Sequence, residues 1–136
     1  MRIHHIGYLV KKIDKAKDSF ISIGFSVKQE TIYDQFRDVN ILFMEKDGYM
    51  IELVSPHSEK SVVAHLMKTY KNSPYHICYE SENFNEDTTS LAKKGFMSID
   101  QPAPAPALNG RRVCFFISPQ IGIIELLEGG CESECL

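Results

Sequence analysis

The sequence lacks a long apolar run, a strong charge of either sign and a cysteine framework. No apolar stretch in its 136 residues approaches the roughly 20 residues that cross a bilayer, and no charged-then-apolar leader opens the chain. We therefore expect a cytoplasmic protein without a membrane span. The net charge of −3 does not give the basic surface typical of binding to nucleic acid or an anionic membrane. Small neutral or anionic molecules remain as candidate partners.

The four cysteines do not make a disulfide framework. Cys78 and Cys114 lie in apolar, strand-like stretches, whereas Cys131 and Cys135 lie in the polar tail "GGCESECL". This distribution fits a reducing compartment. The tail pair could bind a soft metal or bridge two chains, but two cysteines with no histidine beside them are more often incidental.

The sequence contains an internal repeat. A shift of 71 positions aligns six identical pairs, His5 with His76, Ile6 with Ile77, Tyr8 with Tyr79, Ser19 with Ser90, Gly24 with Gly95 and Phe25 with Phe96. A shift of 73 aligns "NILFMEKDGYMIELV" with "VCFFISPQIGIIELL", which pairs Phe43 with Phe116 and Glu52 with Glu125. Such self-similarity predicts that the two halves fold into the same arrangement of helices and strands.

Each copy contains the same order of periodic patterns. Apolar residues recur at helical spacing between residues 13 and 23, which predicts an amphipathic helix that starts at Asp14 and stops at Gly24. The strands predicted around it are His4–Val10, Phe25–Ile32, Val39–Glu45 and Tyr49–Val54. The second copy repeats the pattern with strands Tyr75–Glu80, Arg112–Ile117 and Gly122–Leu127 and a helix marked by Phe84, Leu91 and Gly95.

The remaining segments connect or follow the copies. An apolar stripe from Val62 to Tyr70 predicts a connector helix with Ser58 as its cap and the stripe in the core. The proline-rich segment Asp100–Gly110 predicts a stiff surface loop. We thus expect one α+β domain over 1–136, with module one at 1–56, the connector helix at 57–73, module two at 74–128 and a tail at 129–136.

Two glutamates stand in unusually apolar surroundings. Glu52 lies in "MIELV" and Glu125 in "IIELL", at the same position of the repeat. Strand alternation could turn either side chain toward water, but each copy also carries one histidine on its first strand, His5 or His76. Two imidazoles and two carboxylates suit a divalent transition metal with positions left for water or substrate. The other histidines, His4, His57 and His65, have no counterpart in the repeat and are expected to be surface or packing residues.

The stretches "HHIGYLV", "MIELVSP", "YHICYE" and "GRRVCFFISPQIGIIELLE" resemble the vicinal oxygen chelate superfamily, which includes glyoxalase I, methylmalonyl-CoA epimerase, extradiol dioxygenases and bleomycin-resistance proteins. The resemblance covers nearly the whole chain. It implies two βαβββ modules in tandem that form an open, U-shaped mixed sheet around a metal such as nickel, cobalt or zinc. It also implies His5, Glu52, His76 and Glu125 as metal ligands, and a homodimer.

Two branches of that superfamily fit in different ways. The motif wording is most similar to the methylmalonyl-CoA epimerase branch, although epimerases usually carry glutamine where this chain has Glu52 and a carboxylate base where it has Asn40. Two histidines with two glutamates instead resemble bacterial nickel- or cobalt-preferring glyoxalase I. Both branches remove a proton beside a metal-polarised carbonyl, of a thioester or of a glutathione thiohemiacetal. The resemblance makes Glu125 or Glu52 the candidate base.

Two other readings share the fold. A non-catalytic small-molecule-binding protein of the drug-resistance type would need no metal. A ring-cleaving dioxygenase ranks last, because it requires a site of two histidines and one carboxylate for iron and usually a longer chain.

Three arginines are candidate substrate contacts. Arg111 and Arg112 stand where the proline-rich segment returns to the sheet, and Arg37 lies in the matching loop of the first copy. Guanidinium groups suit a phosphate or the carboxylates of glutathione. The alternative is that all three are solvated loop charges.

Overall fold

The computed structural model describes residues 1–130, and the tail cysteines Cys131 and Cys135 therefore lie outside the described residues. Residues 1–130 contain nine β-strands, three α-helices and one short 3-10 helix. They divide into two compact units, one of residues 5–75 and one of residues 1–4 with the chain from 76 onward. In this described part, no helix is both long enough and apolar enough to cross a membrane.

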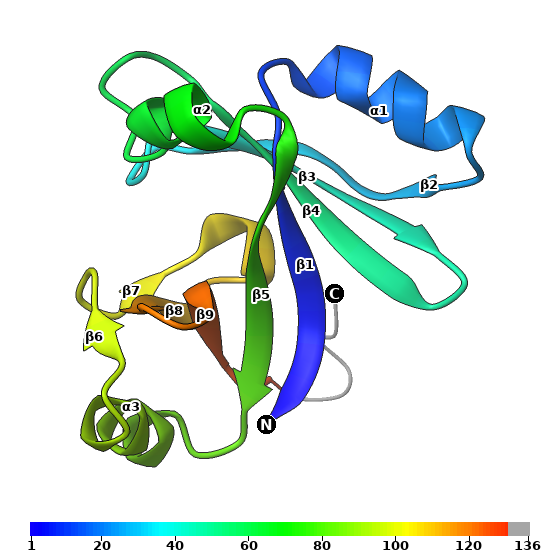
Figure 1. Cartoon of the computed structure of the whole chain (residues 1–136). Helices are drawn as coiled ribbons and strands as arrows, with labels where there is room; N and C mark the ends of the chain where they lie inside the picture. Colours follow the sequence, from blue (N-terminus) through cyan, green and yellow to red (C-terminus); the bar gives the residue numbers. More distant parts are fainter. Residues whose placement is uncertain (131–136) are drawn as a thin grey trace. The chain divides into compact units, whose positions relative to one another are not determined.

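The first unit holds a βαβββ module followed by a short helix. Its strands are hydrogen-bonded in the order β2-β3-β4-β1, with β1 parallel to β4 and the other neighbours antiparallel. The helix α1 packs on β3 and β4 (Figure 1). The elements are β1 (Arg2–Leu9, whose first residues belong to the other unit), α1 (Ile13–Ser22), β2 (Ser26–Asp34), β3 (Val39–Lys46), β4 (Tyr49–Pro56) and α2 (Ala64–Tyr70).

The second unit repeats the module with small additions. Its strand order is β5-β9-β8-β6, with β7 also paired to β8, and β5 is parallel to β9. The helix α3 packs on β9 and β6. The elements are β5 (Ser73–Ser81, which begins in the first unit), α3 (Phe84–Lys93), β6 (Met97–Ser98), β7 (Ala103–Pro104), the 3-10 helix η1 (Pro106–Leu108), β8 (Arg112–Ser118) and β9 (Gly122–Glu128).

The predicted helix ends follow from backbone geometry. Gly24 and Gly95 have φ angles of +106° and +94°, which glycine adopts without strain, and each follows its helix directly after the cap residue. Asp14 lies in the first turn of α1, where its charge suits the helix dipole, but the cap position is Lys12 and has no side-chain cap bond. Gly24 and Gly95 are thus confirmed as helix stops, and Asp14 is not a cap.

Each sheet has one face that packs against its helix. In the first unit the core beneath α1 is formed by Val10, Ile13, Leu42, Met44, Ile51 and Leu53. In the second, the core beneath α3 is formed by Phe84, Leu91, Cys114, Phe116, Ile124 and Leu126. Because side chains alternate along a strand, Glu52 and Glu125 lie on the face of each sheet opposite its helix.

The connector differs from its prediction. The helix α2 is only Ala64–Tyr70, its cap position is Val63, and Ser58 lies too far upstream to cap it. Ser58 Oγ instead donates a hydrogen bond to Asp38. The expected core stripe is also wrong for Val62 and Tyr70, which are exposed, because so short a helix buries only the residue before it, Val63.

The proline-rich segment is not a surface loop throughout. It forms the two-residue strand β7 at the edge of β8 and then η1, and its residues Ala105, Ala107 and Leu108 are buried. Proline suits both an edge strand and the start of a helical turn, so the prolines shape this segment without keeping it on the surface.

Candidate metal centre

The first unit brings His5 and Glu52 together. They lie on the parallel neighbours β1 and β4, and Gly7, two residues after His5 on the same face, is the register partner of Glu52. His5 Nε2 is 3.5 Å from Glu52 Oε1. Both residues are buried, with 1% and 5% of their surface exposed, so the alternative of a glutamate turned to water is wrong for Glu52.

The second unit brings His76 and Glu125 together in the same way. They lie on the parallel neighbours β5 and β9, and Cys78, two residues after His76, is the register partner of Glu125. His76 Nε2 is 3.2 Å from Glu125 Oε1, and both residues are buried. Each unit by itself therefore supplies one imidazole and one carboxylate from equivalent strands.

A phenylalanine lies across the strand from the glutamate of each pair, and in the second unit it is Phe115, not the Phe116 that the repeat aligns with Phe43. Phe43 is the cross-strand partner of Glu52, and Phe115 is the partner of Glu125. Phe116 instead lies in the core beneath α3. The hairpin between β8 and β9 leaves three residues between Ser118 and Gly122, whereas the turn of the first unit leaves two, between Lys46 and Tyr49. This one-residue difference in turn length shifts the equivalence from Phe116 to Phe115.

The donor atoms of each pair suit a shared cation. Two ligand atoms that each lie about 2.1 Å from one ion, at tetrahedral or octahedral angles, are about 3.0 to 3.4 Å apart. The distances of 3.5 Å and 3.2 Å within the two pairs are close to this spacing. Buried carboxylates also need a compensating positive charge, which a divalent ion provides. Imidazole nitrogen and carboxylate oxygen together fit nickel, cobalt or zinc.

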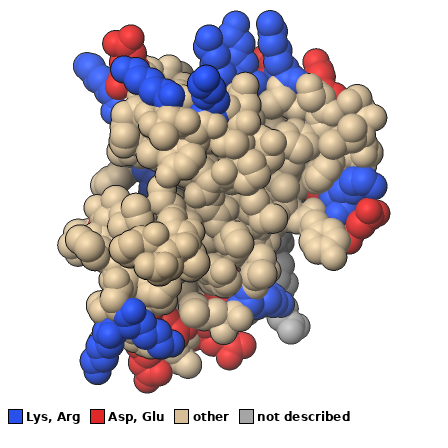
Figure 2. Space-filling model, viewed as in Figure 1, with Lys and Arg blue, Asp and Glu red and all other residues tan. Residues whose placement is uncertain are grey.

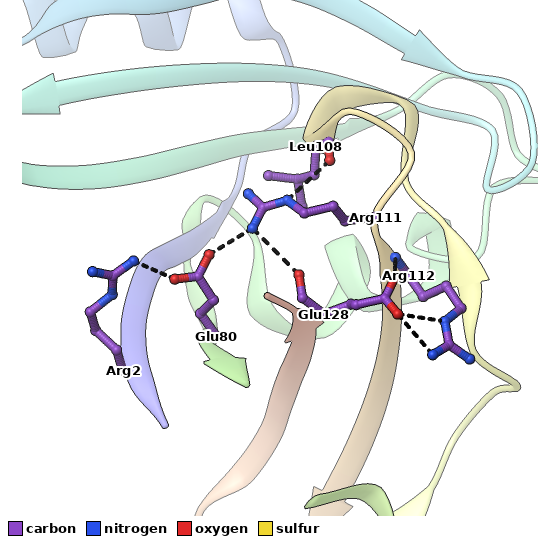
Figure 3. Close-up of polar contacts among 6 residues, drawn as sticks. All are labelled: Arg2, Glu80, Leu108, Arg111, Arg112 and Glu128. Atoms are coloured by element: carbon purple, nitrogen blue, oxygen red, sulfur yellow. Dashed lines mark hydrogen bonds and ion pairs between the residues drawn. The ribbon is translucent and has the colours of Figure 1, made fainter. Parts of the chain in front are cut away.

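The three arginines considered as substrate contacts are each bound to a carboxylate of their own unit. Arg37 Nη1 is 2.8 Å from Asp34 Oδ2, and Arg112 Nη2 is 2.8 Å from Glu128 Oε2. Arg111 is buried and donates from Nη1 to Glu80 Oε2 (Figure 3). Arg111 and Arg37 are therefore not the solvated loop charges of the alternative reading. Their role toward a substrate stays a prediction.

Glu80 is not among the candidate site residues predicted from the sequence. It lies on β5 and accepts hydrogen bonds from Arg111 and Arg2 (Figure 3). Burial is the largest single influence on the pKa of Glu80 and raises it, but the bonds and charges of Arg111 and Arg2 together lower that pKa below its ordinary value. One signal was visible in the sequence: Glu80 is the only acid of its predicted strand, Tyr75–Glu80.

Asn40 lies away from the His5–Glu52 pair. Its cross-strand partner is Ser55, three positions along β3 from the Phe43–Glu52 pair, so alternation turns it to the other face of the sheet. Asn40 Oδ1 is 3.3 Å from His57 Nδ1. His57 in turn packs against the ring of Tyr33, and His65 is exposed, as expected for surface or packing residues.

A groove of about 740 Å³ is a separate feature of the first unit. Its lining includes Tyr8 and Phe20, which pack against the core beneath α1, so it belongs to the helix side of the sheet. Lys11, Lys12 and Lys15 also line it. Figure 2 shows lysine and arginine side chains gathered at the upper edge of the view, where Figure 1 places α1 and α2. The groove is not part of the His5–Glu52 face.

The repeated modules and their His–Glu pairs define a glyoxalase-like protein. The family model of the Glyoxalase/Bleomycin resistance protein/Dioxygenase superfamily matches residues 4–115, and the chain belongs to this superfamily. The resemblance found in the sequence motifs is confirmed.

Several individual proteins are similar to the chain. Human mitochondrial methylmalonyl-CoA epimerase is 26% identical over 128 residues, which cover 92% of this chain and 72% of the relative. Among solved structures, a hypothetical protein from Bacillus halodurans has a TM-score of 0.84 at 23% identity, with 96% of each chain covered. A Streptomyces coelicolor methylmalonyl-CoA epimerase variant in complex with 2-nitronate-propionyl-CoA has a TM-score of 0.80 at 20% identity, covering 96% of this chain and 99% of that one. These likenesses confirm the predicted glyoxalase-like α+β fold.

Proposed function

We propose that this protein is a metal-dependent enzyme that removes and returns a proton on the carbon beside a thioester carbonyl, as an acyl-CoA epimerase does. The observation that carries the proposal is the buried His–Glu pair at the same place in both modules, His5 with Glu52 and His76 with Glu125. The methylmalonyl-CoA epimerases among its relatives support the choice of reaction.

In this proposal the two pairs bind one divalent metal ion. A pair alone supplies two ligands, which is fewer than the four that nickel, cobalt or zinc takes at least. Two equivalent pairs supply four ligands of the right types and leave room for substrate oxygen. When bound, the metal would polarise the substrate carbonyl and so acidify the adjacent C–H bond.

The glutamates are the proposed proton carriers. On the face with Glu52, alternation places Val39, Ile41 and Phe43 of β3, all of them apolar. On the face with Glu125, β8 presents Val113, Phe115 and Ile117. Those apolar positions offer no other acid or base beside the pairs; Glu45 follows Phe43 on the same face of β3, but its side chain is 41% exposed and paired with Lys28. Glu125 takes the proton from one face of the α-carbon, and Glu52 delivers a proton to the other face, which inverts the centre without net loss of protons.

Two other functions stay open to the same fold. A lactoylglutathione lyase would use the same ligands on a glutathione thiohemiacetal. A drug-sequestering protein would bind a small molecule without a metal. The structural neighbours with bound CoA thioesters favour the CoA substrate, and the two buried acid–imidazole pairs favour the enzyme over the binding protein.

The test is a substrate panel on protein loaded with nickel, cobalt or zinc and on protein stripped with a chelator. Methylmalonyl-CoA in D2O should exchange its α-proton and epimerise with the loaded protein only. Methylglyoxal with glutathione should give little product by comparison. Turnover of the glutathione adduct alone would replace the proposal with the lyase, and failure to bind any of the three metals would favour the binding protein.

A further inference from the structure

The structure assigns a positioning role to Phe43 and Phe115: each holds the imidazole ring of its unit, that of His5 or His76, in the orientation that points Nε2 toward the neighbouring glutamate. The inference rests on the proposed metal site and extends it to two residues that would not touch the metal.

The contact has the same geometry in both units. The rings of His5 and Phe43 are 5.2 Å apart between centroids and inclined at 80°. The rings of His76 and Phe115 are 5.3 Å apart and inclined at 86°. Both are edge-to-face contacts, the arrangement that aromatic rings prefer over a face-to-face sandwich.

The strand register explains why the contact recurs. Each phenylalanine is the direct cross-strand partner of the glutamate, Phe43 of Glu52 and Phe115 of Glu125. It therefore projects from the same face of the sheet as the glutamate and the histidine. The module thus places three side chains together from three strands, a histidine, a glutamate and a phenylalanine, and it does so twice.

An imidazole needs such a contact because its own torsion does not fix it. The χ2 torsion of histidine joins an sp³ and an sp² carbon, and its energy profile is broad, so the plane of the ring is set by its neighbours. A wrongly turned ring points Nε2 away from the glutamate. Hydrogen-bonding groups that orient metal-binding histidines typically contribute ten- to a hundredfold to metal affinity, and the weaker edge-to-face aromatic contact should contribute less.

Simple core packing is the competing explanation, and the chain offers matched controls for it. Phe116 is adjacent to Phe115 but buried in the core beneath α3, away from His76. Phe20 makes edge contacts with Tyr8 and Phe25 at 5.2 Å and 5.1 Å, so it resembles Phe43 in aromatic contacts without touching a histidine. Replacing these two residues removes packing but leaves the imidazoles held.

The test compares Phe43→Leu and Phe115→Leu with Phe20→Leu and Phe116→Leu. Affinity for Co²⁺ is measured by competition with a chromophoric chelator, and the visible absorption of bound Co²⁺ reports the ligand geometry. We expect each of the first two variants to lose about three- to tenfold in affinity, as aromatic pair strengths imply, with shifted absorption bands. Both controls should stay within about twofold of wild type. Phe115→Tyr keeps an aromatic ring at this half-buried position and should therefore retain wild-type affinity.

A second measurement does not depend on the metal. In the metal-free protein, carbon-13 relaxation of the histidine rings should show His76 exchanging between orientations in Phe115→Leu but not in wild type or Phe116→Leu. Wild-type affinity and unchanged ring order in both Leu variants would overturn the inference. If wild-type protein bound no metal, the metal site itself would fail, and the ring measurement would still decide whether the phenylalanines hold the imidazoles. Because Phe115 is only half-buried, its variants decide the matter even if Phe43→Leu does not fold.

Discussion

Arg111, which is buried, forms an ion pair with the partly buried Glu80 in the second unit. Arg111 Nη1 donates to Glu80 Oε2 over 2.6 Å, and only 7% of Arg111 is exposed (Figure 3). Its Nε also donates to the carbonyl of Leu108, and Nη1 lies 3.4 Å from the carbonyl of Glu128. The arginine thereby joins η1 to β5 and β9, three segments distant in sequence.

Removing the carboxylate of this pair should destabilise the fold strongly. Glu80→Gln leaves the Arg111 charge buried without its partner, a change that costs about 3 kcal/mol or more. Arg2→Ala is the control, because Arg2 binds the same carboxylate but its side chain is 74% exposed, and such a pair contributes at most about 1 kcal/mol. Urea unfolding measures both. Equal losses in the two variants would show that Arg111 does not depend on Glu80.

The same pair makes stability fall in acid. The pKa of Glu80 is lower in the folded protein than its ordinary value, so its contribution is complete above the unfolded pKa, about 4.5, and is lost as the pH falls through the lower folded pKa. The free energy of unfolding should therefore decline below about pH 4.5 more steeply in wild type than in Glu80→Gln. Glu128, whose pKa is lowered first by its hydrogen bond from Arg112, adds a decline of the same sign. Parallel curves for wild type and Glu80→Gln would contradict the assignment.

Loss of either histidine should abolish tight metal binding. His5→Ala and His76→Ala each remove one proposed ligand, and we expect the affinity for Ni²⁺ or Co²⁺ to fall more than about 100-fold. His65→Ala is the control, because His65 is exposed on α2. Isothermal titration of chelator-treated protein measures all three. If His5→Ala or His76→Ala bound the metal with wild-type affinity, that histidine would not be a metal ligand.

The roles of Glu52 and Glu125 can be distinguished by measuring α-proton exchange in each epimer of the substrate separately. Glu52→Gln and Glu125→Gln keep an oxygen for the metal but lose the base, and each should abolish epimerisation, with a loss of about 100- to 10,000-fold. Each should still exchange the α-proton of one epimer with D2O, and the two variants should act on opposite epimers. NMR of each pure epimer follows the exchange, with metal content and unfolding as controls. A metal-replete, fully active Glu125→Gln protein would reject its role as base.

The buried residues of the proline-rich segment should behave as core residues. Leu108 is 1% exposed, so Leu108→Ala should cost about 2 to 5 kcal/mol of unfolding free energy. Ile121→Ala, at a residue that is 62% exposed in the β8–β9 hairpin, should cost no more than about 0.5 kcal/mol. Thermal unfolding of the two variants compares them. A small loss of unfolding free energy in Leu108→Ala would instead support the prediction, made from the prolines, that this segment is a surface loop.

Sequence patterns predicted most helices and strands correctly, because each pattern reflects a physical preference of residues that are close together in the chain. The apolar spacing of residues 13 to 23 predicted α1, and Gly24 ended it because only glycine tolerates the positive φ there. The paired positions of Glu52 and Glu125 predicted equivalent strands, and both glutamates are buried beside the expected histidines. The connector was less predictable, because its apolar stripe is compatible with a longer helix than the one that forms.

The amino-acid sequence by itself determined the duplication, the order of elements in each module and the His–Glu pair that each module carries, because these depend on periodicity and on residues a few positions apart. Tertiary structure alone decided that Phe115, and not Phe116, lies beside the second pair, that three residues of the proline-rich segment are buried, and that Glu80 pairs with Arg111. The physical reason is that strand register, set here by one extra residue in a hairpin, and contacts between distant segments leave no periodic trace in the sequence.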